Sequence, residues 1–411
     1  MLIFEFKVKA KSIQYGAIDE AIRTAQFIRN KCLRFWIDNE KVSKYDLNKY
    51  SAVLANEFSF ADKLNSMARQ SSAERAWSAI SRFYNNCKKS RQVISGGSFP
   101  QKNPAVAGLK GYPKFQKNNR SVEYKTTGWK LAENRKSITM TDKNGIGKLK
   151  LCGTRDLNFY QPEQIKRVRL VRRADGYYCQ FAISVERTEV LSATGNTLGL
   201  DVGLESFCTN SNGQKIQNPR FYRLGEVKMK RAQKLVSRKI KGSSNRNKAR
   251  TKLGRVHLKI SRQRQDHAIK LARCVVQSND LIAYEDLRSK NLVKNHNLAK
   301  SINDAGWYQF RLWLEYFGKV FGRITIAVNP AYTSAECSDC GVIVKKSLST
   351  RTHVCQCGCV LDRDENAALN ILTKAIGTTG HVGTLELDSI NASGETTTTL
   401  VDESLLEQVV S

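Results

Sequence analysis

Apolar and polar residues alternate along the first ten residues of the chain, and this alternation predicts a β-strand with one buried face. From Ala17 to about Lys88 the apolar positions instead recur three and four residues apart, which predicts helices. The polar segment from Lys88 to Lys114 contains glycines and is predicted to be a loop. The chain is therefore expected to begin with one strand that is followed by a helical insertion.

Strand patterns return after this loop, at 137–142, 147–151, 166–173 and 177–186. Asp175-Gly176 lies between the last two patterns and predicts a hairpin turn. Together with the first strand, these segments predict an N-terminal β-barrel or sheet. The segment from Thr188 to Asn196 is mixed and turn-like, and we expect a domain boundary there.

A second unit is predicted after this boundary. Its strands are rich in apolar residues, and its longest helical stretch is strongly basic. The predicted elements are two strands at 196–210, two amphipathic helices between 223 and 264, strands at 280–287 and 323–330, a loop after the first of these, and a helix from 307 to 320. Strands that alternate with helices predict an α/β layer.

The charge of the chain narrows the choice of partner. The sequence has 68 Lys and Arg residues against 37 Asp and Glu, a net charge of +31. From Thr379 to Ser411 there are six acidic residues and no basic one, so the excess belongs to the preceding part of the chain. Such a surface predicts a nucleic-acid partner, and the acidic tail at 379–411 is predicted to be disordered.

The sequence also excludes several classes of protein. It contains no run of eighteen apolar residues, and its N-terminus lacks the features of a signal peptide, so we expect neither a membrane span nor secretion. Eleven cysteines are present, six of them scattered singly. This distribution favours a reducing cytoplasm and a metal site over a disulfide framework.

Three acidic residues lie where catalytic metal ligands are expected. Asp201 and Glu285 each end an apolar strand, and Asp364 lies at the start of a helix. Phosphodiester cleavage with two Mg²⁺ ions needs carboxylates that converge from different elements. Asp362, with Glu365 three residues later, suits the helix N-cap and leaves Asp364 free to bind metal. The order and context of these residues predict a ribonuclease-H-like nuclease.

A cysteine cluster between the second and third acidic motifs has the spacing of a zinc ribbon. Cys337 and Cys340 form the first pair. The second is Cys355 with Cys357, because Cys357 precedes a glycine, and Cys359 is the rival ligand. Four thiolates leave no open coordination position, so we expect one structural Zn²⁺.

In several motifs the chain resembles the TnpB (OrfB) family of RNA-guided nucleases, which belong to insertion sequences and are related to type V CRISPR effectors. Besides the cysteine cluster and the basic helices, the motifs are Gly111–Phe115, Gly199–Gly203, Asp304–Trp307, Pro330–Ser334 and Asp362–Asn370. The resemblance implies that Asp201, Glu285 and Asp364 form a RuvC-type catalytic triad. It also implies an N-terminal wedge-like β-barrel with an inserted helical recognition lobe, and a C-terminal RuvC domain with an inserted zinc ribbon. The expected boundaries are 1–190 with the insertion at about 15–108, 191–378 with the ribbon at about 331–361, and a tail at 379–411.

The same resemblance implies that the protein binds a transposon-derived guide RNA and cuts target DNA beside a short adjacent motif. The alternatives are a guide-independent nuclease or transposase accessory protein, and an RNA-guided DNA-binding repressor that does not cleave. Basic and polar residues are expected to contact the nucleic acids, including the RNA–DNA hybrid. They are Gln70, Arg75, Lys114, Lys117, Arg120 and the segment 114–124 in the first part of the chain, and Lys228, Lys230, Arg231, Lys234, Arg238, Lys239, Arg255 and Arg262 on the basic helices.

Overall fold

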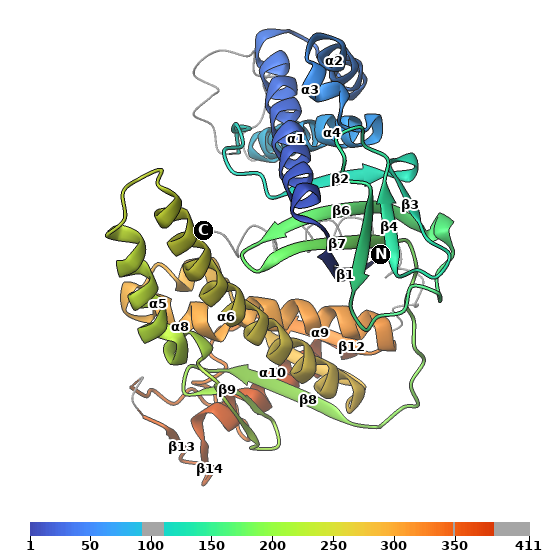
Figure 1. Cartoon of the computed structure of the whole chain (residues 1–411). Helices are drawn as coiled ribbons and strands as arrows, with labels where there is room; N and C mark the ends of the chain where they lie inside the picture. Colours follow the sequence, from blue (N-terminus) through green and yellow to red (C-terminus); the bar gives the residue numbers. More distant parts are fainter. Residues whose placement is uncertain (93–110, 348–349, 382–411) are drawn as a thin grey trace. The chain divides into compact units, whose positions relative to one another are not determined.

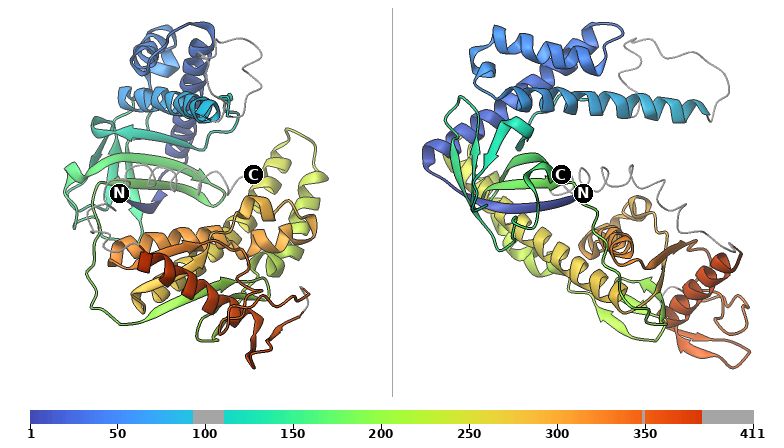
Figure 2. Two further views of the ribbon diagram at one scale, coloured as in Figure 1. Left: turned by 180° about the vertical axis from the view of Figure 1, so that it is seen from behind. Right: turned by 90° about the vertical axis from the view of Figure 1, so that its right-hand side faces the viewer.

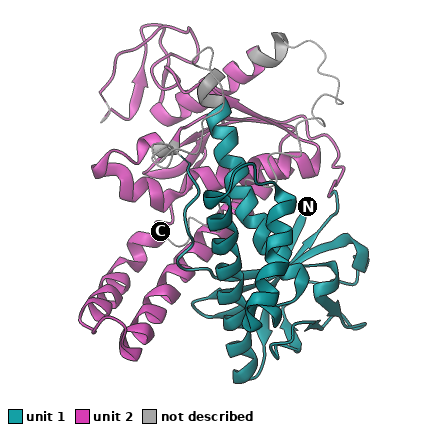
Figure 3. Cartoon of the chain, turned by 90° about the horizontal axis from the view of Figure 1, so that it is seen from above, with its two compact units in different colours: residues 1–186 teal, residues 187–411 magenta. Residues whose placement is uncertain are grey.

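The computed structural model describes residues 1–92, 111–347 and 350–381 (Figure 1). The chain divides into two compact units, residues 1–186 and residues 187–411 (Figure 3). Among the residues that the structure describes, no helix has both the length and the hydrophobicity that crossing a lipid bilayer requires.

The first unit is built on a seven-stranded antiparallel sheet with the order β2-β6-β7-β1-β5-β4-β3. Its strands are β1 Leu2–Lys9, β2 Ser121–Lys125, β3 Trp129–Leu131, β4 Ser137–Met140, β5 Lys148–Cys152, β6 Ile165–Arg173 and β7 Gly176–Ile183. The first strand of the chain lies inside the sheet, paired with β5 on one side and β7 on the other. The sheet curls (Figure 2), but within the described residues β2 and β3 remain its two edges, so the predicted barrel is a curled open sheet.

Four helices are inserted between β1 and β2. They are α1 Ser12–Asp38, α2 Lys44–Glu57, α3 Ser59–Asp62 and α4 Ser66–Gln92. The helices pack on one another and against β2, and their buried side chains join those of the sheet in one core. The predicted helical insertion is confirmed. The predicted loop begins too early, because α4 continues to Gln92, and positions 93–110 lie outside the described residues.

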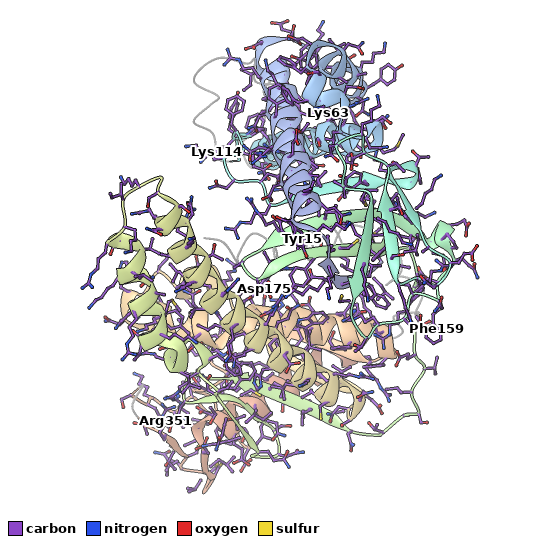
Figure 4. The ribbon with its side chains drawn as sticks, in the orientation of Figure 1. Tyr15, Lys63, Lys114, Phe159, Asp175 and Arg351 are labelled. Atoms are coloured by element: carbon purple, nitrogen blue, oxygen red, sulfur yellow. The ribbon has the colours of Figure 1, made fainter. Side chains whose placement is uncertain are left out.

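Two details of the first unit differ from the sequence-based expectation. The turn between β6 and β7 is Ala174-Asp175, one residue earlier than predicted, because Gly176 already pairs with Arg173 (Asp175 is labelled in Figure 4). The strand β2 lies within the segment predicted to read DNA. Val122, Glu123 and Tyr124 are buried there, so the end of that segment faces the core.

The second unit contains a five-stranded mixed sheet with the order β10-β9-β8-β11-β12. Its strands are β8 Thr197–Val202, β9 Ser206–Asn210, β10 Lys215–Gln217, β11 Leu281–Glu285 and β12 Ile324–Val328. The first three strands in the chain form an antiparallel meander, whereas β11 runs parallel to both β8 and β12. Because β11 lies between two parallel neighbours, the carboxyl ends of β8, β11 and β12 share one edge of the sheet.

The described part of this unit also contains α5 Phe221–Ser237, α6 Ser244–Gln277, α7 Ser289–Leu292, α8 His296–Ala305, α9 Trp307–Phe321 and α10 Arg363–His381. Of these helices, α6, α9 and α10 cover the two faces of the sheet. Side chains of α6 and α9 share a core with β8, β9 and β11, and α10 packs with β11 and β12 in a separate core. The α10 backbone comes so close to β8 that a Cβ at Gly199 would lie 2.0 Å from the carbonyl oxygen of Ala368.

The two basic helices and most strands of this unit were predicted, but α6 continues to Gln277, well beyond the predicted end at 264. Three further parts differ from the prediction. The predicted loop after β11 contains α7 and α8, and the strand β10 was not foreseen. The helix α10 continues to His381, three residues into the predicted tail, and the rest of the tail lies outside the described residues. Between β12 and α10 a small hairpin, β13 Thr352–Val354 with β14 Val360–Asp362, carries the cysteine-rich segment.

Candidate functional site

Asp201 and Glu285 are neighbours at the carboxyl edge of the second sheet. The parallel register pairs Ala283 with Gly199 and Tyr284 with Leu200. The next residue on β8 is Asp201 and the next residue on β11 is Glu285. Strand pairing therefore places two carboxylates, which are 84 positions apart in sequence, side by side on neighbouring strands.

The third acidic motif reaches this edge from α10. Asp362 ends β14 and accepts a hydrogen bond from the backbone N–H of Asp364 at 3.0 Å, as an N-cap residue does. Its carboxylate also pairs with Lys215 at 2.6 Å, and although burial raises the pKa of Asp362, these contacts lower it below its ordinary value overall. Asp364 lies in the first turn of the helix, and the predicted cap by Asp362 is found in the structure.

The charges of Glu285 and Asp364 act on Asp201. Desolvation, followed by these two charges, raises the pKa of Asp201 well above its ordinary value. Within the described residues, no hydrogen-bond donor contacts the Asp201 carboxylate. A buried carboxylate that faces two like charges without a donor of its own is stabilised as an anion when a cation joins it, so the arrangement fits hard metal ions.

Two arginines neutralise Asp364 in the structure. Arg363 donates to its Oδ1 from Nε and Nη2 at 3.2 and 3.1 Å, and Arg351 lies 3.8 Å from its Oδ2. Arg351, labelled in Figure 4, extends from the cysteine-rich segment and also pairs with Glu205 at 2.9 Å. Asp364 is thus held at the edge of the sheet between its own helix and the ribbon.

Glu285 is oriented by a residue that the sequence analysis did not single out. The Thr333 hydroxyl donates a hydrogen bond to the Glu285 carboxylate. Burial raises the pKa of Glu285, while the Thr333 hydroxyl and the charge of Lys374 act in the opposite direction without reversing the shift. Thr333 belongs to the Pro330–Ser334 motif, so its position in a motif was visible from the sequence, but its partner was not.

The spacing of the acidic cluster differs from that of the cysteine cluster. In the part of the chain that the structure describes, groups of three or more potential ligands within 4.8 Å of one another are found only in the cysteine-rich segment. The three carboxylates are therefore near enough to influence one another's charge but do not converge on one point.

The four cysteines predicted to bind zinc meet in one place. The sulfur atoms of Cys337, Cys340, Cys355 and Cys357 lie within 4.8 Å of one another, with 3.7 Å between Cys337 and Cys357 and 3.5 Å between Cys340 and Cys355. A tetrahedral Zn²⁺ with Zn–S bonds of about 2.3 Å separates its sulfur ligands by about 3.8 Å. The observed distances fit such a site.

The rival ligand Cys359 belongs to a second, overlapping group. Cys359 and His353 are both buried, and with Cys337 they form three potential ligands within 4.8 Å. Burial raises the pKa of the Cys337 thiol, but donors that include the backbone N–H groups of Cys340 and Asp339 and the His353 side chain outweigh it and lower the pKa to about 5. His353 was not foreseen, although it lies two residues before Cys355.

The basic helices present their charges to solvent. The apolar residues Met229, Leu258 and Ile260 are buried, whereas every predicted contact residue on α5 and α6 and in the turn between them is exposed. These residues are Lys228, Lys230, Arg231, Lys234, Arg238, Lys239, Arg255 and Arg262. The buried carboxylate of Asp304 accepts hydrogen bonds from the backbone N–H groups of Tyr222 and Arg223 and so caps α5.

The predicted contact residues of the first unit have two kinds of environment. Lys114, Lys117 and Arg120 are exposed. Gln70 and Arg75 are half-buried, and Arg75 donates to the Ser121 hydroxyl and lies 3.8 Å from the Glu123 carboxylate.

Comparisons with known proteins match both parts of the second unit. The model of the OrfB_IS605 family, described as a probable transposase, matches residues 180–296. The model of the Cas12f1-like TNB domain matches residues 307–371. The first match contains Asp201, Glu285 and the basic helices, and the second contains the cysteines and Asp364.

Two relatives carry the name "Putative RNA-guided DNA endonuclease". The one from Streptomyces pristinaespiralis is 42% identical over 186 residues, and the match spans 45% of this chain and 46% of the relative. The one from Escherichia coli K12, called InsQ, is 28% identical over 279 residues, which are 64% of this chain and 68% of the relative.

A solved structure also resembles the chain as a whole. It is the cryo-EM structure of a Cas12f1–sgRNA–target DNA complex, with 15% identity and a TM-score of 0.51, and the match covers 86% of this chain and 81% of that one. At this identity the likeness concerns the fold alone. Taken with the two family models and the two relatives, it supports the resemblance of the chain to the TnpB (OrfB) family.

Proposed function

We propose that this protein is an RNA-guided DNA endonuclease that hydrolyses the phosphodiester backbone of target DNA with two Mg²⁺ ions. The observation that carries the proposal is the parallel register of β8 and β11, which sets Asp201 beside Glu285 while α10 supplies Asp364. The strand order of the second unit, an antiparallel meander followed by parallel strands, supports its assignment as a ribonuclease-H-like, RuvC-type domain. The first unit corresponds in this proposal to the wedge and recognition lobe.

Asp201, Glu285 and Asp364 would hold the ions. Two ions about 3.5–4 Å apart do not require all three carboxylates at one point, which agrees with the spacing of the cluster. Bound Mg²⁺ would activate water and stabilise the charge on the phosphate. Arg351 and Arg363, now on Asp364, would remain beside it to balance charge near the substrate.

The nucleic-acid partners follow from charge and from the relatives. The relatives' names refer to RNA guidance, and the related solved structure contains a guide RNA and target DNA. The exposed cations of α5 and α6 can neutralise backbone phosphates without reading bases, which suits recognition by pairing with a guide. Cys337, Cys340, Cys355 and Cys357 would bind one structural Zn²⁺.

The test separates metal ligands from a neighbouring carboxylate. The variants Asp201→Asn, Glu285→Gln, Asp364→Asn and Asp362→Asn are compared for cleavage of target DNA and for target binding, with guide RNA and Mg²⁺. The first three should lose cleavage by several orders of magnitude and keep binding, because each removes an anionic metal ligand. Asp362→Asn should still cut, since asparagine caps a helix as well as aspartate does.

Two outcomes would contradict the assignment. If Asp362→Asn is inactive while Asp364→Asn cleaves, the third ligand is Asp362. If all four variants cleave, the catalytic site lies elsewhere in the chain.

A further inference from the structure

The loop between β12 and the first cysteine, residues 329–336, touches both candidate metal sites. At one end, the Thr333 hydroxyl donates to the Glu285 carboxylate. At the other end, Glu336 directly precedes Cys337. A displacement of this loop would therefore move a donor of the carboxylate site and a ligand of the cysteine site together.

Two asparagines on α10 fix the loop. Asn370 donates from Nδ2 to the carbonyl oxygens of Thr333 and Glu336, both at 2.8 Å. Asn366, one turn earlier, donates to the Glu336 carbonyl at 2.7 Å and accepts from the backbone N–H of Ser338 at 2.9 Å. Both asparagines are almost fully buried.

These bonds are costly to break, because a buried carbonyl that loses its donor pays the desolvation penalty of an unsatisfied polar group. The Glu336 carbonyl accepts hydrogen bonds from two donors, which an oxygen with two lone pairs can do. Lys374 adds a bond from Nζ to the Ala331 carbonyl at 2.8 Å and an ion pair with the Glu336 side chain at 2.9 Å. The loop is therefore held against α10 from Ala331 to Ser338.

The same helix begins with Asp364. The bonds of Asn366 and Asn370 thus tie the first turn of α10, the hydroxyl on Glu285 and the backbone on both sides of Cys337 into one network. Two sites that share such a network influence each other's ligand affinity, and the influence is reciprocal.

We propose that zinc binding by the cysteines and Mg²⁺ binding by the carboxylates are coupled through the loop 329–336, with Thr333, Asn366 and Asn370 as positioning residues. Zinc holds Cys337, the asparagines transmit this position to Thr333, and Thr333 orients Glu285 for metal. By reciprocity, Mg²⁺ at the carboxylates raises the affinity of the cysteines for zinc. The inference rests on the proposed Mg²⁺ site.

The experiment measures zinc affinity and not cleavage. Purified full-length protein is mixed with a chromogenic chelator selective for Zn²⁺, and the zinc that the protein retains at equilibrium is measured with and without MgCl₂. In the unmodified protein, Mg²⁺ should raise the zinc affinity at least about fivefold, the lower end of ordinary coupling between sites. A calorimetric titration with MgCl₂ gives the Mg²⁺ affinity of the same samples and of samples stripped of zinc.

Three variants identify the route of the coupling. Thr333→Val removes the hydroxyl while keeping the shape of the side chain. The logarithm of the factor by which Mg²⁺ strengthens zinc binding should therefore fall below about half of its value in the unmodified protein. Thr333→Ser keeps the hydroxyl and should keep the effect of Mg²⁺ on zinc binding. Thr373→Val makes the same change on the exposed side of α10, where the hydroxyl bonds only the Leu369 carbonyl, and should have no effect.

Asn370→Ala should also weaken the effect of Mg²⁺ on zinc binding. Because this change removes two buried hydrogen bonds and could unfold the cysteine-rich segment, the test of the coupling rests on the isosteric Thr333→Val variant. The coupling is refuted if Mg²⁺ binds in an Asp201-dependent manner while the zinc affinity is the same with and without it. It is also refuted if Thr333→Val retains the full effect of Mg²⁺ on zinc binding. If the protein shows no Asp201-dependent Mg²⁺ binding, the proposed carboxylate site itself is wrong, and the coupling falls with it.

Discussion

Glu123 on β2 illustrates how a single buried charge is held in this protein. Its side chain is 4% exposed and lies 2.8 Å from both Arg167 and Arg169 and 3.8 Å from Arg75. Burial alone would raise the pKa of Glu123, but the charges of Arg75, Arg169 and Arg167 outweigh it and lower the pKa to about 2. The carboxylate therefore links α4 and β6 to the edge strand β2 through ion pairs. This contact also occupies Arg75, one of the residues predicted to read DNA.

Replacing Glu123 should change the acid stability of the protein. Because the folded pKa lies below the ordinary value of 4.5, Glu123 contributes stability above pH 4.5, and this contribution is lost as the pH falls towards 2. A shift of this size corresponds to about 3 kcal/mol. Glu123→Gln should be less stable than the original protein at pH 7, and the difference should shrink in acid. Urea unfolding between pH 7 and pH 3 measures it.

The matched control is Glu133→Gln, which changes an exposed glutamate of the same unit. Its stability should follow that of the original protein at every pH. A Glu123→Gln protein whose deficit stays constant or grows as the pH falls would show that the arginines do not stabilise the Glu123 carboxylate.

At the scale of single residues, the sequence predicted local chemistry better than distant contacts. Asp362 was expected to cap α10, because a cap acts on backbone groups two or three residues away, and the structure has this bond. The bond from Thr333 to Glu285 joins residues 48 positions apart. Nothing in either motif encodes that distance, since strand pairing and the packing of α10 create it.

At the scale of elements, β8 is the strand on which the second unit depends. It pairs with β9 on one side and β11 on the other, and α10 lies against it. Gly199 permits this contact because it has no side chain towards Ala368. A buried central strand with both faces covered reads as a continuous apolar run, which is why it was predictable.

Gly199→Ala should be strongly destabilising. The added Cβ would lie 2.0 Å from the backbone oxygen of Ala368 and 3.0 Å from Leu372, so the α10 backbone must move. We expect a loss of more than about 2 kcal/mol in the free energy of unfolding, measured by urea denaturation, because overpacking against a backbone cannot be relieved by a rotamer change. Cleavage should fall too, since α10 carries Asp364.

Gly16→Ala provides a control of opposite sign. Gly16 lies inside α1 with open space around the position of a Cβ, and alanine is the better helix former. This variant should be more stable by about 0.5–1 kcal/mol. Equal effects of the two substitutions would remove the close approach of α10 as the reason for glycine at position 199.

The elements that escaped prediction are short or lie at edges. β3 and β10 have three residues each, too few for an alternation to be identified, and β2 lies at an edge of its sheet. The helix α8 did carry readable signals, since Asn295 caps its start and Gly306, with a left-handed φ of 70°, ends it. A pattern of polar residues outweighed these caps and led to the incorrect prediction of a loop.

At the scale of the whole molecule, excess positive charge is the dominant property. The sequence carries a net charge of +31, and the two helices α5 and α6 expose cations along much of their length. Composition alone predicted a nucleic-acid partner, because this argument needs no coordinates. The order of the guide, the hybrid and the duplex on the surface depends on shape and on pairing, which composition does not contain.

RNA binding should therefore weaken steeply with salt. The logarithm of the affinity should fall linearly with the logarithm of salt concentration, with a slope of about −0.7 per neutralised phosphate for single strands. The double variant Lys234→Gln with Arg238→Gln should make this slope shallower by about 1.4, because it removes two such contacts. Filter binding at several salt concentrations gives the slopes.

The comparison variant, Lys130→Gln with Lys136→Gln, removes the same charge from exposed positions of the first unit. It should leave the slope nearly unchanged if α5 contacts the RNA directly. Equal losses in both double variants would assign the effect to total charge and not to the basic helices.

The one-to-one register of β8 with β11 has a consequence for changes in chain length. Inserting a single residue before Asp201 within β8 would turn the carboxylate to the opposite face of the sheet, so the spacing from Thr197 to Asp201 is rigid. The turn between α5 and α6 has no such constraint, because it belongs to no strand. There a Cβ at Gly242 would meet open space, so this turn is a natural place for added sequence.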